Sequence, residues 1–167
     1  MRLTIAAVGR SRESPEQVLC DLYCERAGAL AARLGVSKLE LSVVETSRAA
    51  SPEERMKEEA AKLSGKLPAG AHLVALDEAG RAMSSESFAQ HLRKMADTGT
   101  RDLVFIIGGP DGLAPALRET AHERIAFGPQ TWPHLLVRAM LAEQIYRAFA
   151  ILSGHPYHRA RAVARSR

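Results

Sequence analysis

Side chains that can bind and titrate are concentrated at the end of the chain, in the stretch GHPYHRARAVARSR (154–167). This stretch holds two histidines, one tyrosine and four arginines, and it contains no acidic residue. A tyrosine ring can stack on a base, arginines can pair with phosphates, and a histidine changes its charge near neutral pH. A solvated, frayed terminus is the common alternative for chain ends. We expect a substrate-gripping segment through Arg159 and a frayed end beyond Ala160.

The charge distribution favours a polyanionic partner. The chain has 23 Lys and Arg against 19 Asp and Glu, and the four arginines after residue 158 account for the whole net charge of +4. A neutral body with a basic terminus is typical of a protein that binds RNA. No apolar run approaches the ~20 residues of a membrane span, and no signal-peptide pattern opens the chain. We therefore expect a cytoplasmic protein that has no membrane partner.

A second set of candidate groups precedes the tail, on a long apolar helix that begins near Pro133. Each has a structural alternative. Glu143 and Arg147 have the i,i+4 spacing of a surface ion pair, and Tyr146 can be a packing or dimer residue. Arg138 can cap a carbonyl group or pair with an acid across a dimer, and His155 can simply end the helix. The candidates on the helix and tail are Arg138, Glu143, Tyr146, Arg147, His155, Tyr157 and His158.

Three turns rich in glycine or proline provide candidate ligand-binding backbone. They are ALDEAGR (75–81), IIGGPDGL (106–113) and FGPQTWPH (127–134). None matches a Walker loop or a GxGxxG nucleotide motif, and GGPDG alone is equally compatible with a tight strand-to-helix turn. Each turn follows a predicted strand, and ligands in such sheets bind at the carboxyl ends of the strands. We expect the three turns to meet at one edge of one sheet.

The elements that position these groups alternate between strands and helices. Strands are predicted at 3–9, 38–46, 72–77, 102–109 and 124–127. Helices are predicted from the cap Ser14 to Gly35, from the cap Ser51 to Leu63, from Ser84 or Ser85 to Gly99, near 114–123, and from Pro133 to Ser153. This alternation predicts one α/β domain, with a mostly parallel sheet and helices on both faces. Cys20 and Cys24 read as small apolar residues, and we predict neither a disulfide nor a metal site.

Several of these segments, in this order, resemble the SPOUT methyltransferase family. They are VFIIGGPDGL, TWPHLLVRAMLAEQIYRAFAI and GHPYHR, with LTIAAVG and LVALDEAGR before them. The resemblance is greatest to the members that methylate N3 of a pseudouridine in large-subunit (23S) ribosomal RNA. It implies a C-terminal trefoil knot, a homodimer, S-adenosylmethionine as cofactor, and ribosomal RNA, plausibly in assembled ribosomes, as substrate. It runs from Met1 to about Arg159, which implies a methyltransferase domain at 1–160 and a basic tail at 161–167.

The resemblance also implies roles for particular residues. The cofactor is expected on Leu76, Gly108, Gly109, Phe127, Gly128, Pro129, Gln130, Thr131 and Trp132. Tyr157 is assigned to hold the base, and His158 is assigned either to assist loss of the N3 proton or to contact a neighbouring phosphate, with Glu143 and Arg147 as further catalytic candidates. Contacts to the RNA are assigned to Arg138, Tyr146, His155 and Arg159. A non-catalytic RNA-binding or ribosome-assembly factor on the same scaffold is the alternative, although such a protein would not need the glycines of a cofactor slot.

Overall fold

The computed structural model describes residues 1–9 and 14–158. The predicted boundary at residue 160, the basic tail at 161–167 and the predicted RNA contact of Arg159 lie outside these residues. Across the described part of the chain, no helix is both long enough and apolar enough to span a bilayer.

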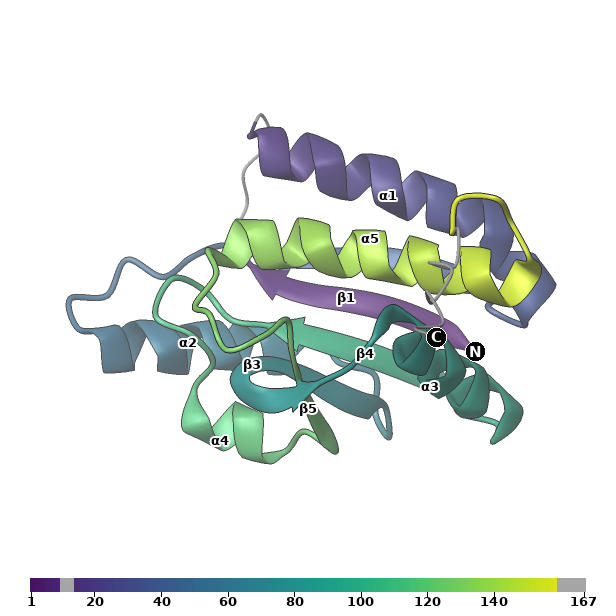
Figure 1. The fold of residues 1–167 in the computed structure, drawn as a ribbon. Helices are drawn as coiled ribbons and strands as arrows, with labels where there is room; N and C mark the ends of the chain where they lie inside the picture. Colours follow the sequence, from purple (N-terminus) through teal and green to yellow (C-terminus); the bar gives the residue numbers. More distant parts are fainter. Residues whose placement is uncertain (10–13, 159–167) are drawn as a thin grey trace, which may run out of the picture.

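Five strands form one sheet in the order β2-β1-β4-β3-β5 (Figure 1). All the pairings between them are parallel. The prediction of a single α/β domain is therefore confirmed. β4 is central and buried at every residue, as its apolar run Leu103–Ile107 predicts, and Asp102 at its start is paired with Arg2. The strands are β1 (Arg2–Val8), β2 (Lys38–Val44), β3 (His72–Ala82), β4 (Asp102–Ile107) and β5 (Glu123–Ala126).

The helices cover both faces of the sheet and give the molecule two hydrophobic cores. One core packs α1, α3 and α5 against the sheet, and it includes Phe105, Phe149 and Leu92. The smaller core lies on the opposite face, where α2 and α4 contribute Leu63 and Leu117. The helices are α1 (Pro15–Ala31), α2 (Pro52–Ser64), α3 (Ser85–Asp97), α4 (Pro115–Glu119) and α5 (His134–Ser153), and a 3-10 turn, η1 (Ala32–Leu34), follows α1.

Local signals in the sequence start and stop the helices where expected, with one exception. Ser51 caps α2 in a capping box with Glu54, and Gly154 ends α5 with a φ of 68°. Ser14 caps α1 by accepting a hydrogen bond from the Gln17 backbone N–H. The sequence SPEQ at 14–17 also suggests a capping box with Gln17, but the Gln17 side-chain amide donates instead to Asp21, one turn further along the helix.

The third strand is longer than the sequence predicts. Its first part pairs with β5 up to Leu76 and Ile125; the chain then makes an excursion at residues 77–80, and Arg81 resumes pairing at Ile125. A Cβ atom on Gly80 would lie 2.6 Å from the backbone of Ile125, so only glycine allows this approach. The expected turn after residue 77 is therefore an irregularity inside β3.

Candidate functional site

The three glycine- and proline-rich turns follow neighbouring strands at the carboxyl edge of the sheet, as predicted. Ala75 of β3 pairs with Ile106 of β4, and the next residue, Leu76, pairs with Ile125 of β5. The excursion after Leu76 also contacts the last turn directly, since the Thr131 hydroxyl donates to Glu78 at 2.8 Å. The predicted cofactor residues therefore lie around one edge, and most of what they offer there is backbone.

The turn after β4 is packed tightly against itself. A Cβ atom on Gly108 would lie 2.3 Å from the carbonyl group of Gly112 and 2.6 Å from the nitrogen of Leu113. Gly109 accepts a hydrogen bond from the Gly112 N–H at 3.0 Å, and the same two residues form an isolated bridge. Glycine is therefore needed here for the turn to close, in addition to any close approach to a ligand.

Helix α2 holds this turn from the face of the sheet opposite α5. The Arg55 guanidinium makes two hydrogen bonds to Asp111, at 2.7 and 3.0 Å. These bonds raise the pKa of Arg55 and lower the pKa of Asp111. One helical turn later, the buried carboxylate of Glu59 lies against Gly109. The turn is therefore fixed by side chains from a distant part of the sequence.

The turn between β5 and α5, residues 127–132, combines an exposed aromatic ring with a strained glycine. The Trp132 indole N–H donates to the Phe127 carbonyl oxygen at 3.3 Å, which closes the turn on itself. The Trp132 side chain stays 38% exposed. Gly128 has a φ of 99°, a conformation that favours glycine, and the Gln130 side chain lies close to it. Pro129 and Gln130 complete the turn, so an adenosine-sized ligand would meet backbone groups and one aromatic face.

The catalytic candidates on α5 and the following residues form one cluster. The Tyr157 hydroxyl donates to Glu143 at 2.9 Å, and Glu143 is also ion-paired with Arg147. The Arg147 guanidinium lies 4.9 Å from the centre of the Tyr157 ring. Tyr146 packs on the same ring at 4.4 Å between centroids, and His155 packs edge-on against Tyr146. The expected ion pair of Glu143 and Arg147 is therefore present and also orients the tyrosine.

Tyr157 and His158 have different electrostatic surroundings in this cluster. Burial, followed by hydrogen bonds with Tyr23 and with the Glu143 carboxylate, raises the pKa of Tyr157, so its phenol stays protonated at neutral pH. His158 lies beside the cluster, with its Nε2 atom 3.2 Å from Glu86 on α3. Its Nδ1 atom is buried and has no hydrogen-bond partner among the described residues. Tyr157 is therefore a hydrogen-bond donor, while His158 keeps one ring nitrogen without a partner in this part of the structure.

The cofactor turns and this cluster lie toward opposite ends of α5 (Figure 1). His134, the first residue of α5, lies against Gly9 just past the carboxyl end of β1. Arg147 follows thirteen residues later, about 20 Å along the helix axis. Within one chain, the structure does not bring Tyr157 or His158 to the cofactor turns.

Two of the predicted RNA contacts are buried within the chain. Arg138 is 0% exposed and donates to the Gly9 carbonyl oxygen at 2.8 Å, while its Nε and Nη2 atoms have no partner among the described residues. Tyr146 is 7% exposed and packs between Tyr23 and Tyr157. The alternatives given above for these residues, a carbonyl cap and a packing residue, describe their place in the structure. The prediction that they face RNA is wrong for the isolated chain, because α5 is packed between α1 and α3.

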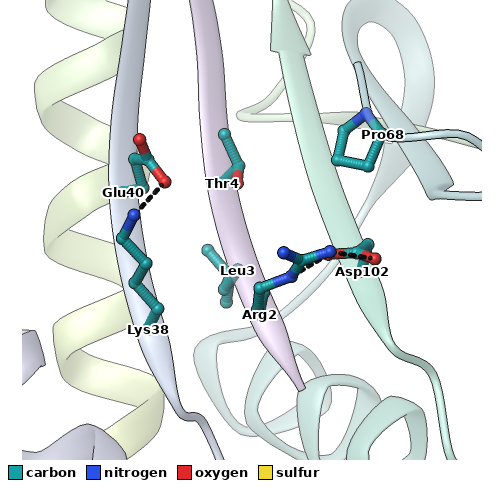
Figure 2. Close-up of a pocket in the computed structure, with 7 residues that line it drawn as sticks. All are labelled: Arg2, Leu3, Thr4, Lys38, Glu40, Pro68 and Asp102. Carbon is teal, nitrogen blue, oxygen red and sulfur yellow. Dashed lines mark hydrogen bonds and ion pairs between the residues drawn. The ribbon is translucent and has the colours of Figure 1, made fainter. Parts of the chain in front are cut away.

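A small hollow at the amino edge of the sheet is unrelated to these turns (Figure 2). Its volume is about 80 Å³, and the charged groups beside it are already paired, Arg2 with Asp102 and Lys38 with Glu40. These residues begin or closely follow the starts of their strands, whereas the cofactor turns follow the strand ends. The hollow is lined by Arg2, Leu3, Thr4, Lys38, Glu40, Pro68 and Asp102. Because the hollow is small and the charged groups beside it are paired with one another, it does not suit a nucleoside.

Sequence reasoning missed the side chains that support the site from other elements. Arg55 and Glu59 lie on a helix whose sequence is charged along most of its length, and nothing local distinguishes the buried carboxylate from its neighbours. Their i,i+4 spacing, which places them on one face, is the only available signal. Glu86 lies in the first turn of α3, and nothing in the sequence indicates that it meets His158.

Comparisons with known proteins agree along almost the whole chain. A family profile described as "Predicted SPOUT methyltransferase" matches residues 1–158. The chain is 48% identical over 160 residues to the ribosomal RNA large subunit methyltransferase H of Bradyrhizobium diazoefficiens, covering 96% of this chain and 100% of that protein. It is 49% identical to the protein of the same name from Xanthobacter autotrophicus, with the same coverage. A probable methyltransferase of Bordetella pertussis superimposes with a TM-score of 0.45 and 17% identity, covering 88% and 95% of the two chains, a similarity too low to bear on function.

Proposed function

Because this chain belongs to the SPOUT methyltransferase family, we propose that it transfers a methyl group from S-adenosylmethionine to large-subunit ribosomal RNA. The observation that carries the proposal is the full-length identity of 48–49% to enzymes named for that activity. The family resemblance of the motifs makes N3 of a pseudouridine the acceptor. The trefoil knot, which the same resemblance implies, remains a prediction. Such a substrate also places the protein in the cytoplasm.

The groups at the carboxyl edge fit the cofactor. The turn after β4 and the turn at 127–132 offer backbone donors and acceptors, and Trp132 offers an exposed ring beside them. A buried carboxylate oxygen of Glu59, which has no hydrogen-bond partner in the described part of the chain, lies beneath Gly109, and this suits a ligand that carries positive charge. The cofactor supplies an electrophilic methyl group. Leu76, Gly108, Gly109 and the turn at 127–132 bind it and exclude water from it.

The acceptor base is assigned to the cluster at the end of α5. The Tyr157 ring holds the base by stacking, and its hydroxyl, fixed by Glu143, has a set direction. Arg147 supplies a positive charge beside the ring, which favours an anionic base. His158 takes the proton of the imide N3, because the pKa of the Tyr157 phenol is raised and leaves that group protonated. Without removal of that proton, N3 is a poor nucleophile.

Because the cofactor turns and the cluster around Tyr157 lie far apart along α5, one chain alone does not form a complete site. A base held by Tyr157 would lie about 20 Å from the cofactor turns of the same chain, and methyl transfer requires contact. A homodimer resolves this if the tail of one subunit meets the turns of its partner. The apolar residues Val18, Leu19 and Leu22 of α1 are 38–62% exposed, and such a patch is typical of an interface. An interface that includes part of α5 around Ala139, Glu143 and Tyr146 stays a prediction, and within one chain Ala139 and Tyr146 are already buried.

One assay tests the activity. Methyl transfer from labelled S-adenosylmethionine is measured on assembled ribosomes, free large subunits and naked ribosomal RNA. Incorporation at N3 of a pseudouridine is expected, with the greatest rate on assembled ribosomes. Binding to ribosomes without incorporation on any of the three would contradict the proposal and favour a non-catalytic assembly factor.

A mixing experiment tests the shared site. Tyr157→Ala and Gly108→Val should each be inactive. Tyr157→Ala lacks the ring that holds the base, and Gly108→Val has a damaged cofactor turn. After denaturation and refolding together, about a quarter of the wild-type activity should return, since half of the dimers are then mixed and each has one intact site. No recovery, or a fully active monomer by light scattering, would show that each subunit works alone.

A further inference from the structure

We propose that Glu59 provides a buried negative charge beneath the cofactor turn, which favours the positively charged cofactor over its neutral product. This inference rests on the proposed function, since methyl transfer from a sulfonium is the step that removes the positive charge. Glu59 is a positioning residue in this account, because it acts on the cofactor through the field of its carboxylate.

The Glu59 carboxylate is buried and only half satisfied. The residue is 2% exposed, on the face of α2 that packs against the sheet. Its Oε1 atom accepts a hydrogen bond from the Ser47 backbone N–H at 2.9 Å. Its Oε2 atom is shielded from water and meets no hydrogen-bond donor within residues 1–9 and 14–158. An unpaired carboxylate oxygen in a protein interior costs free energy, which makes its position informative.

The unpaired oxygen is aimed at the backbone of the cofactor turn. A Cβ atom on Gly109 would lie 2.7 Å from Glu59 Oε2 and 3.0 Å from the Val8 side chain. The carboxylate therefore sits directly against Gly109, on the side of the turn that faces α2. The opposite side of the same short turn is the one proposed to carry the cofactor.

Among the described residues, Arg55 of α2 lies closest to Glu59 along the helix face, and another carboxylate already binds it. The guanidinium of Arg55, one helical turn earlier, is bound to Asp111 through two hydrogen bonds. The charge of Glu59 contributes to the raised pKa of Arg55, but less than Asp111 does. Since the Glu59 oxygens are shielded from water, solvent screens their field weakly. The turn therefore presents a negative potential to whatever binds on it.

The reaction changes the charge of the ligand, so this negative potential affects the cofactor and the product differently. In the transfer, the bond from sulfur to the methyl carbon breaks, sulfur keeps the electron pair, and the acceptor N3 forms the new bond while its proton leaves to a base. The sulfonium becomes a neutral thioether, so the ligand loses one positive charge. With an effective dielectric constant of about 20, one charge pair about 10 Å apart changes an equilibrium roughly ten- to twentyfold. Glu59 is expected to raise the affinity for the cofactor by about this factor and to leave the affinity for the product almost unchanged.

The experiment compares two ligands on the full chain. Isothermal titration calorimetry measures the affinities for S-adenosylmethionine and S-adenosylhomocysteine in wild type, in Glu59→Gln and in Glu58→Gln. Glutamine keeps the shape of the side chain and an oxygen for the Ser47 N–H, but removes the charge. Glu58→Gln is the matched control, because it removes the same charge from the adjacent, exposed position. Glu59→Gln should bind S-adenosylmethionine about tenfold more weakly and S-adenosylhomocysteine within twofold of wild type, while Glu58→Gln should change neither.

The outcomes separate this inference from the proposed function. An equal loss for both ligands would mean that Glu59 only shapes the turn, and unchanged affinities would mean that its charge does not reach the ligand. Either result overturns the inference. If wild type binds neither ligand, the proposed function itself fails. If Glu59→Gln does not fold, Glu59→Met replaces it, since its side chain has a similar length and removes the buried charge, although it leaves the Ser47 N–H without its acceptor.

Discussion

Substitution of Gly108 by alanine is expected to damage the cofactor turn from within. The added Cβ atom would lie 2.3 Å from both the carbon and the oxygen of the Gly112 carbonyl group. Ordinary contacts of such atoms begin about 1 Å further apart. Since the obstacle is backbone, no side-chain rotation relieves the contact, and the segment from Gly109 to Leu113 must move.

The size of the effect follows from that displacement. Overpacking by one methyl group in a closely packed region costs typically 1–3 kcal/mol of stability. A shift of roughly 1 Å in groups that position a reactant reduces rates by about 100-fold. We therefore expect Gly108→Ala to lower the free energy of unfolding by about 1–3 kcal/mol. We expect it to weaken S-adenosylmethionine binding by at least about tenfold, equivalent to 1.4 kcal/mol.

Urea unfolding and calorimetry with S-adenosylmethionine measure the two quantities. Gly28→Ala is the control, because Gly28 is an exposed residue of α1 and nothing lies within 4 Å of its added Cβ atom. That substitution should raise stability by about 0.5–1 kcal/mol, as alanine does in place of glycine in a helix, and leave binding unchanged. Wild-type affinity in a folded Gly108→Ala protein would refute the assignment of this turn to the cofactor.

Three further predictions concern other parts of the molecule. Burial lowers the pKa of His91 and outweighs the opposing charge of Glu123, so the folded state disfavours the protonated ring. Stability in urea should then fall as the pH drops from 7.5 to 5.5, through the unfolded value of about 6.5, and should fall less in His91→Gln. Tyr157→Phe should keep RNA affinity within about twofold, whereas Tyr157→Ala should lose about tenfold or more, since stacking contributes 1–3 kcal/mol per base. Deletion of residues 161–167 should weaken RNA binding more at low than at high salt and spare turnover at saturating substrate; a collapse of turnover would place those arginines in the active site.

Most of the fold could be predicted from the sequence because its signals are local. The apolar run of β4 and the capping box at Ser51 each depend on a few adjacent residues, and both are confirmed. The extension of β3 could not be predicted in this way. The residues after Leu76 have the composition of a turn, and they resume pairing only because Gly80 passes against the backbone of Ile125 from a distant strand.

The parts of the candidate site that depend on backbone conformation could be predicted from the sequence. The parts that depend on the packing of distant side chains could not. The glycines of the turn after β4 show their role by residue type, because few other residues fit there. Burial of a charged side chain has no such local sign. Arg138 was assigned to RNA because arginines usually are exposed, yet α5 places it in the interior, and Glu59 was hidden within a charged helix for the same reason.

The buried Arg138 has a positional consequence for the site. It donates to the carbonyl oxygen of Gly9, whose φ of 92° and close approach to His134 exclude any larger residue there. These contacts fix the start of α5 against the end of β1, and the cofactor turn at 127–132 leads directly into that start. The same helix carries Glu143 and Arg147 further along its length. The position of one rigid helix therefore sets both the cofactor turn of a subunit and the place where that subunit presents Tyr157, which is why we expect an exchanged tail between two subunits and not a flexible tail folding back within one.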